Sequence, residues 1–409
     1  MGKKERIIWI DQLKGFIFFL VILGHLSINT TLKSYIYSFH MPIYFLITGL
    51  NYNTEKIYQA KAKDYLIKLS TRMLVPYVWM QTTIMCVRFV EALIRGGEVP
   101  ASRYIKGMLY GNSIKIASAA NPLYFVLVLF LAEAALFFVI KLVKGNKTAV
   151  CAICILVLPL SLFTQGVALP WHLNVTPFAM FLIMLGNLLM GAYRANEEKI
   201  RELSNLKNIL IAVLLLLIGA IAWYYNGRFS LHDNKYGKNF VIAMISALST
   251  STALALIFIR IPKIRFLSFV GKYTLFYLGT HKALITLARA ICRGHSKEPI
   301  FNAVTAVVIF FALIPITMFF KKFAPFVLGI YNSGQGTVLT IGQVVCVLAA
   351  TCVPYRYFLI HLKDGLLIST APLTIVSVAA YFVLCTATFF LLRKVFTFAF
   401  LIEPKKSQN

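Results

Sequence analysis

Three ionisable side chains lie in or just before the first apolar segment of the chain, LKGFIFFLVILGHL at residues 13–26. They are Asp11, Lys14 and His25. A helix advances about 100° and about 1.5 Å per residue, so Lys14 and His25 share one face and lie about 16 Å apart along the axis. Asp11 precedes Lys14 by three residues, which allows an ion pair on the same face. The spacing therefore predicts a polar stripe along an otherwise apolar helix.

Such a stripe indicates function, because an ionisable side chain inside a membrane helix is costly. Histidine is the usual general base near neutral pH. We therefore predict that His25 removes a proton from a substrate, and that Lys14 and Asp11 complete the catalytic set. In the alternative interpretation, Lys14 reaches the membrane interface and His25 lies near the far surface.

The composition indicates which elements must hold these residues. Hydrophobic residues make up 59% of the 409 and charged residues only 13%, with a mean hydropathy of +0.77. A soluble protein would carry about 25% charged residues. The apolar residues form long continuous blocks, which favour membrane helices over a β-barrel. The fold class predicted from this pattern is all-α, a polytopic transmembrane helical bundle.

The apolar blocks are close to the ~20 residues that cross a bilayer, and they predict about 10 to 12 spans. We place twelve, at residues 7–28, 35–51, 74–94, 121–141, 149–166, 175–193, 208–225, 240–259, 266–288, 300–320, 337–355 and 372–392. Lysine and arginine concentrate in alternate loops, as they do on the cytoplasmic side of membranes. We expect a multi-pass protein of the cell membrane with both termini in the cytoplasm, although four basic residues at 95–115 interrupt the alternation.

Two other classes of site receive little support. The net charge of +27 could suggest a nucleic-acid partner, but the basic residues fall mainly in short loops between apolar blocks, so no nucleic acid is expected. Cys151 and Cys154 form a C-x-x-C pair without a second pair or a ligand histidine nearby. We interpret them as packing residues and expect no metal site.

Six segments, taken in order, resemble the membrane-bound acyltransferase 3 family, and one of them its sugar O-acetylase-like branch. They read RIIWIDQLKGFIFFLVILGHL (6–26), SFHMPIYFLITGLNY (38–52), STRMLVPY (70–77), NPLYFVLVLF (121–130), LPWHLNVTPFAMFLIMLGNLL (169–189) and FLSFVGKYTLFYLGTH (266–281). Thr48 and Thr274 stand where the family usually has serine, and Tyr124 where tryptophan is common. The resemblance covers residues 1–320 as one transmembrane domain and leaves 321–409 as additional C-terminal helices of the same bundle.

The resemblance implies transfer of an acetyl group from cytoplasmic acetyl-CoA to a hydroxyl of an envelope or exopolysaccharide sugar. Acetyl-CoA would be a co-substrate, with no bound cofactor, and the other partners would be a glycan or lipid-linked sugar and the bilayer. Arg72 and Lys68 would bind the phosphates of coenzyme A. His40 and His281 would line the acceptor pocket. Glu133, the lone carboxylate of its apolar segment, would either join them there or form a structural pair with a buried base. For His172, which follows Trp171 in a loop, an interfacial role is favoured over a functional one.

Two other functions fit parts of the same pattern. A proton-coupled transporter would also use an intramembrane Lys–Asp pair and several histidines. No repeat relates the two halves of the chain, which counts against a transporter. A non-catalytic partner in polysaccharide export could keep the family scaffold without its chemistry.

Overall fold

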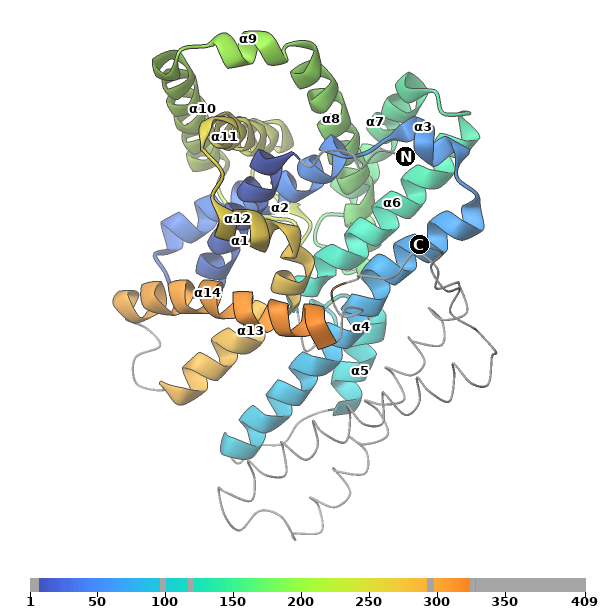
Figure 1. Cartoon of the computed structure of the whole chain (residues 1–409). Helices are drawn as coiled ribbons and strands as arrows, with labels where there is room; N and C mark the ends of the chain where they lie inside the picture. The colour runs from blue at the N-terminus through green and yellow to red at the C-terminus, as the bar shows by residue number, and fades with distance from the viewer. Residues whose placement is uncertain (1–6, 96–100, 117–120, 293–297, 324–327, 329–409) are drawn as a thin grey trace, which may run out of the picture.

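The computed structural model describes residues 7–95, 101–116, 121–292, 298–323 and 328, and almost all of these residues are helical (Figure 1). The helices are α1 (Ile8–His25), α2 (Thr30–Leu50), α3 (Thr54–Gln59), α4 (Ala62–Arg95), α5 (Ala101–Tyr110), α6 (Tyr124–Leu142), α7 (Lys147–Phe163), α8 (Thr176–Ala195), α9 (Glu197–Glu202), α10 (Asn205–Asn226), α11 (Phe240–Arg260), α12 (Arg265–Lys272), α13 (Thr274–Ile291) and α14 (Pro299–Phe323). Two 3₁₀ turns, η1 (Asn121–Leu123) and η2 (Pro170–Val175), precede α6 and α8. Strands β1 (Phe229–Ser230) and β2 (Lys235–Tyr236) form a small antiparallel hairpin.

Within the described residues, six helical segments are long and apolar enough to cross a membrane. Helix α10 is an example, because its outward side exposes the apolar side chains of Leu210, Leu214 and Leu217. Apolar side chains in that position suit contact with lipid rather than water. The prediction of an all-α, multi-pass membrane bundle is confirmed. Ten of the twelve predicted spans coincide with helices, and those at 337–355 and 372–392 lie outside the described residues.

Several helices begin at a polar residue whose side chain accepts hydrogen bonds from backbone amides of the first turn. Asn29 accepts from the amides of Thr31 and Leu32, at 2.9 and 3.2 Å. Asn239 does the same for the start of α11. Because the first amides of a helix have no partner within it, such caps determine where the helix begins. They set the starts of α2 and α11, two of the helices around α1.

Glycines let the central helices approach closely. Gly49 of α2 lies against the backbone of Ile183 in α8, and Gly186 of α8 lies against the backbone of Leu46 in α2. A methyl group at either glycine would collide with the facing carbonyl. Helix packing in membranes relies on such small residues, because lipid supplies no hydrophobic force between helices. The reciprocal pair thus fixes α2 and α8 side by side.

A similar contact joins α1 to α12, where Gly15 faces the Leu267 carbonyl and Gly271 faces the Asp11 carbonyl. The Gln12 side chain of α1 also accepts a hydrogen bond from the backbone amide of Ile264, the residue just before α12. The predicted single span at 266–288 is wrong in this detail, because the helix breaks at Tyr273 into α12 and α13. The break lets α12 pack on α1 while α13 takes a different direction (Figure 1).

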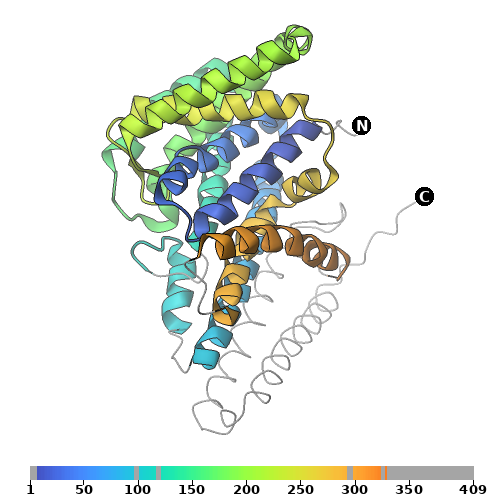
Figure 2. The same cartoon turned by 90° about the vertical axis from the view of Figure 1, so that its left-hand side faces the viewer.

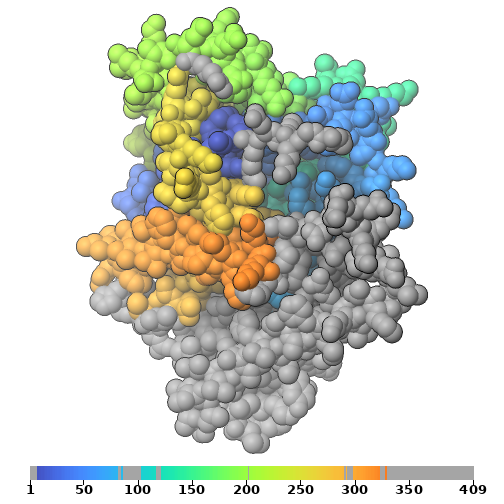
Figure 3. Space-filling view, in the orientation of Figure 1, coloured from blue at the N-terminus to red at the C-terminus, as the bar shows by residue number. Residues whose placement is uncertain are grey.

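The remaining helices surround this centre. Helices α10 and α11 run side by side at one edge of the bundle (Figure 2). Helix α14 packs on α1 and α13 and forms a continuous band across the face seen in Figure 3. The arrangement leaves the C-terminal end of α1 between α2 and α13, which is where the histidines meet.

Candidate active site

A polar cavity of about 670 Å³ lies between the C-terminal half of α1, the first half of α2 and the β1–β2 hairpin. His25 of α1 and His40 of α2 both line it. Three cationic side chains also line it, namely those of Lys33, Arg228 and Lys282. Its volume lies within the ~300–1,000 Å³ typical of ligand sites. Two of the three histidines predicted for the site therefore face one space with positive charge around it.

The backbone at the end of α1 holds His25 in this position. The His25 carbonyl accepts a hydrogen bond from the Arg289 guanidinium of α13 at 3.2 Å. The preceding carbonyl, that of Gly24, accepts one from the Tyr37 hydroxyl, also at 3.2 Å. The last carbonyls of a helix have no partner within it, and a cation there also matches the helix dipole. These two hydrogen bonds hold the C-terminal end of α1 in place, and with it the half-buried His25 imidazole.

His281 of α13 lies directly beside His25, with ring centroids 5.1 Å apart. It is fully buried, and its ring meets Phe18 edge to face. Its Nδ1 is 2.9 Å from the Tyr277 carbonyl, which can only accept, so in the neutral ring the proton is on Nδ1. The buried Nε2 has no hydrogen-bond partner among the described residues. A buried acceptor without a partner, one ring from His25, is the kind of exception that marks functional sites.

His40 is oriented in the same way. Its Nδ1 is 2.8 Å from the Ile36 carbonyl, so in the neutral ring Nε2 carries the lone pair. The Tyr37 ring meets the imidazole edge to face at 4.9 Å. His40 is buried apart from the cavity side, so Nε2 is the ring nitrogen left for a ligand.

The predicted ion pair near the other end of α1 forms, with Lys14 Nζ 3.1 Å from Asp11 Oδ1. Asp11 is buried, and Lys14 is largely covered. The Lys14 carbonyl accepts a hydrogen bond from the Tyr44 hydroxyl of α2 at 3.1 Å. Neither Asp11 nor Lys14 lines the polar cavity. The structure therefore separates the pair from His25 along the helix, as their spacing requires.

Arg72 was predicted to bind the donor and Glu133 the acceptor, but in the structure the two side chains form an ion pair with each other. The Arg72 guanidinium of α4 is 2.6 Å from the Glu133 carboxylate of α6. Glu133 is buried, whereas half of the Arg72 side chain is exposed. Lys68, one turn earlier on α4, is exposed. Arg72 therefore neutralises a buried carboxylate while keeping part of its guanidinium accessible to a ligand.

A hydrogen-bonded chain of three side chains borders the cavity on the other side. The Ser113 hydroxyl is 2.7 Å from His232 Nε2, and His232 Nδ1 is 2.9 Å from Asp233 Oδ1. His232 and Asp233 line the cavity. The hydrogen bond from His232, helped by one from Ser230, lowers the pKa of the Asp233 carboxyl to about 2. Asp233 is therefore ionised at neutral pH.

The segments that carry this chain are anchored to the bundle. The Asn234 amide, in the hairpin turn, donates to the carbonyls of Ser161 and Thr164, both at 2.9 Å. The Asn112 amide, beside Ser113, donates to the Leu169 carbonyl at 2.8 Å. These hydrogen bonds fix both loops to the helical scaffold, and functional groups on loops depend on such support for their position.

His172 belongs to the same cluster. It is buried, with its ring 5.3 Å from that of His232 and 4.9 Å from that of Tyr124. Trp171 and His172 both have a φ of 52°, which is uncommon for residues other than glycine. Backbone strain of this kind clusters at functional sites. The His172 ring therefore belongs to this cluster, and its expected interfacial role stays a prediction.

Sequence reasoning missed Ser113, His232 and Asp233. The adjacent His232 and Asp233 in SLHDNKY, a polar stretch between two apolar helices, were the available signal. Ser113 gave none, because its partner lies 119 residues away and no local pattern links the two.

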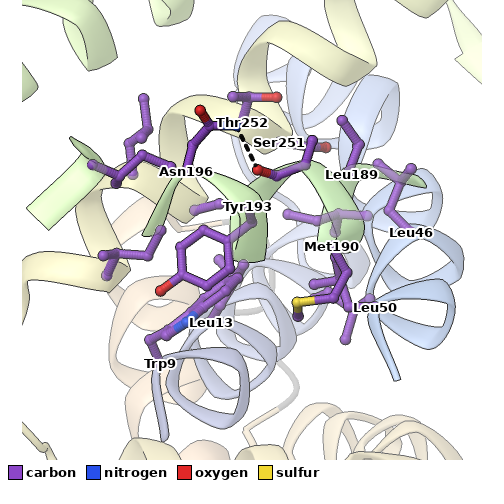
Figure 4. A pocket seen from close by; sticks show the side chains of 17 residues that line it. Trp9, Leu13, Leu46, Leu50, Leu189, Met190, Tyr193, Asn196, Ser251 and Thr252 are labelled. Atoms are coloured by element: carbon purple, nitrogen blue, oxygen red, sulfur yellow. Dashed lines mark hydrogen bonds between the residues drawn. The ribbon is translucent and has the colours of Figure 1, made fainter. Parts of the chain in front are cut away.

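A second pocket, of about 340 Å³, lies near the N-terminal end of α1 between α2, α8 and α11 (Figure 4). Its lining is almost entirely apolar, including Trp9 and Leu13 of α1 and Leu46 and Leu50 of α2. The Trp9 ring meets that of Tyr193 edge to face at 5.9 Å. Among the residues that the structure describes, neither a histidine nor a charged side chain lines it. The described lining therefore offers no general base for proton transfer near neutral pH.

Comparison with known families completes the assignment. The family model for the acyltransferase domain of the acyltransferase 3 family matches residues 7–322. No curated protein and no solved structure matches the chain significantly. The match includes α1, α2 and α13, which bring His25, His40 and His281 together, and also the loop and hairpin of Ser113 and His232. The chain therefore belongs to the acyltransferase 3 family and is a multi-pass membrane acyltransferase.

Proposed function

We propose that the acyl group is acetyl, supplied by cytoplasmic acetyl-CoA, and that the acceptor is a hydroxyl of an envelope or exopolysaccharide sugar. The observation that carries this proposal is the polar cavity, where His25 and His40 face one space of about 670 Å³. An acetyl group alone would leave most of that volume empty, whereas a sugar ring with several hydroxyls matches both the volume and the polar lining. His25 acts as the base that removes the proton from the acceptor hydroxyl.

The neighbours of His25 support this role. The His281 ring lies beside the His25 imidazole, and its Nε2, an acceptor in the neutral ring, has no hydrogen-bond partner among the described residues. His40 offers Nε2 to the acceptor from the opposite helix. Lys33, Arg228 and Lys282 provide positive potential for the oxyanion that forms as the acyl carbonyl is attacked.

The donor approaches from the other half of α1. The Asp11–Lys14 pair lies there, and the half-exposed Arg72 guanidinium with Lys68 forms a basic surface suited to coenzyme A phosphates. In this topology both termini face the cytoplasm of a cell membrane. Donor and acceptor then reach the bundle from opposite sides, which matches the separation of the Asp11–Lys14 pair from the cavity.

The test uses the full chain, purified in lipid nanodiscs and given acetyl-CoA labelled in the acetyl group. With a cell-envelope oligosaccharide present, we expect label on the sugar as a base-labile ester and an equal release of coenzyme A. Release of coenzyme A with labelled acetate as the only product, at any acceptor concentration, would overturn the glycan acceptor. Failure to consume acetyl-CoA with any of a panel of hydroxyl acceptors would overturn the donor.

A further inference from the structure

The Ser113–His232–Asp233 chain has a defined direction. Asp233 is a carboxylate and can only accept, so His232 must donate from Nδ1. A neutral imidazole protonated on Nδ1 carries its lone pair on Nε2, and that nitrogen lies 2.7 Å from the Ser113 hydroxyl. The Ser113 proton therefore points to His232. This is the order of groups that activates a serine nucleophile, and such sets are recognised by geometry rather than by position in the sequence.

We propose that Ser113 is a nucleophile that carries the acyl group as an ester before it passes to the acceptor. The proposal rests on the proposed function and adds a covalent step to it. His232 takes the proton of the Ser113 hydroxyl, and His25 takes the proton of the acceptor hydroxyl. Both histidines line the same cavity. Ser113 lies one hydrogen bond behind His232 and is not itself part of the cavity lining, so the acyl group on it must pass the His232 ring to meet the acceptor.

In the first step Ser113 Oγ attacks the carbonyl of the acyl thioester, and its proton moves to His232 Nε2. The Oγ–C bond forms, the C–S bond breaks, and the thiolate leaves and takes a proton from solvent. In the second step the acceptor oxygen attacks the ester, and its proton moves to His25. The C–Oγ bond breaks, His232 returns its proton to Ser113, and His25 releases one to solvent. The sum is one acyl group moved from sulfur to oxygen with no net change in the enzyme.

Two features beyond the hydrogen bonds support a chemical role. The His172 ring packs against the rings of His232 and Tyr124, and Trp171 and His172 hold left-handed backbone conformations of the kind that clusters at functional sites. Arg228 also reaches Asp233, at 3.3 Å, and its positive charge helps to keep the Asp233 carboxyl ionised, as the orientation of His232 requires.

The first experiment needs neither donor nor acceptor. The purified chain in nanodiscs is treated with a fluorophosphonate, which reacts with activated serine hydroxyls, and the labelled residue is identified by peptide mass spectrometry. We expect labelling at Ser113, slowed by about 10³–10⁴-fold in Asp233→Asn, because the amide favours the wrong histidine tautomer. Ser268→Ala, remote from the cavity, is the matched control and should label at the wild-type rate. Absence of label on Ser113 in the folded protein would overturn the proposal.

The second experiment separates this proposal from the proposed function. In His25→Gln the second step is blocked and the first is not, so labelled acetyl-CoA should leave a stable acetyl ester on Ser113. Ser113→Ala should lose both ester and transfer, and Ser113→Cys should regain acylation as a hydroxylamine-sensitive thioester. Transfer by the wild type with no ester on Ser113 in His25→Gln would overturn the covalent step but leave the proposed function intact. Fluorophosphonate labelling without acetylation by acetyl-CoA would uphold the nucleophile and reject the donor.

Discussion

The two pockets of this protein share helices but differ in chemistry. Helices α1 and α2 contribute His25 and His40 to the polar cavity of about 670 Å³, and Trp9 and Leu46 to the apolar pocket of about 340 Å³. The polar cavity also takes Lys33 from α2, and it draws further charged groups from the hairpin segment and from α13, whereas the apolar pocket is completed mainly by α8 and α11. One pair of helices thus provides a reactive end and an inert end. Position along a helix, rather than the helix itself, decides where proton transfer can occur.

The strongest test of this contrast is a substitution at each end of α1. His25→Gln keeps a polar side chain of similar size but cannot take up a proton near neutral pH. We expect turnover to fall by about 10²–10⁴-fold, the usual contribution of a general base. Leu13→Met, in the apolar pocket, conserves volume and should leave turnover within a few-fold of the wild type. Rates are measured at matched membrane abundance, and near-normal transfer by His25→Gln would remove His25 from the chemistry.

The second test concerns the Arg72–Glu133 pair, which lies outside both pockets. Arg72→Ala leaves the buried Glu133 carboxylate without its partner and should cost up to about 3 kcal/mol, the lower end for a buried pair because Arg72 is half exposed. Adding Glu133→Gln removes the stranded charge and should recover most of that stability in thermal melts. If donor binding also uses Arg72, the KM for acetyl-CoA stays raised in the stable double variant. A normal KM there would make the pair purely structural.

A smaller effect is expected from the close contact that positions α12 against α1. Gly15→Ala pushes a methyl group into the Leu267 carbonyl and should cost about 1–3 kcal/mol. Gly24→Ala, on the same helix, meets only Tyr37 and Ile36 at ordinary contact distance. It should be neutral, or stabilising by up to about 1 kcal/mol through helix propensity. Equal melting temperatures for the two variants would show that the α1–α12 contact is looser than the structure indicates.

The smallest effect is expected from two substitutions that report the orientation of the chain in the membrane, because neither should change the turnover rate. Lys199→Cys on α9 and Lys238→Cys beside the hairpin are exposed positions at opposite ends of α10. In intact cells an impermeant maleimide should label position 238 and not position 199, above the background of the native cysteines. The reverse pattern would place the polar cavity at the cytoplasmic end of the bundle.

The sequence alone was informative wherever the interacting residues lie on one helix. Asp11 and Lys14 are three residues apart, so helix geometry predicts their ion pair without any knowledge of the rest of the fold. His25 was expected in the site from the polar stripe on its helix, and His281 was expected to line the acceptor pocket. Their direct contact depends on the break at Tyr273, and the local signal for it, Gly271 two residues earlier, lies inside what hydropathy predicts as one continuous span.

Residues joined across the bundle could not be predicted in this way. Glu133 showed as a lone carboxylate in an apolar helix, but nothing local identified Arg72 as its partner. Ser113 and His232 belong to segments without hydrophobic periodicity, where sequence patterns carry little positional information. The large-scale fold followed from hydropathy, whereas the pairing of side chains required the tertiary structure.

The contact between α13 and the end of α1 has a mechanical consequence. Helix α13 touches His25 at two points, since the His281 ring lies beside its imidazole and Arg289 binds its carbonyl. A side chain held through both its ring and its backbone loses rotational freedom during folding instead of during each turnover. A sliding or tilting of α13 would therefore carry His25 with it. The alignment of the His25 side chain therefore depends on the positions of both α1 and α13.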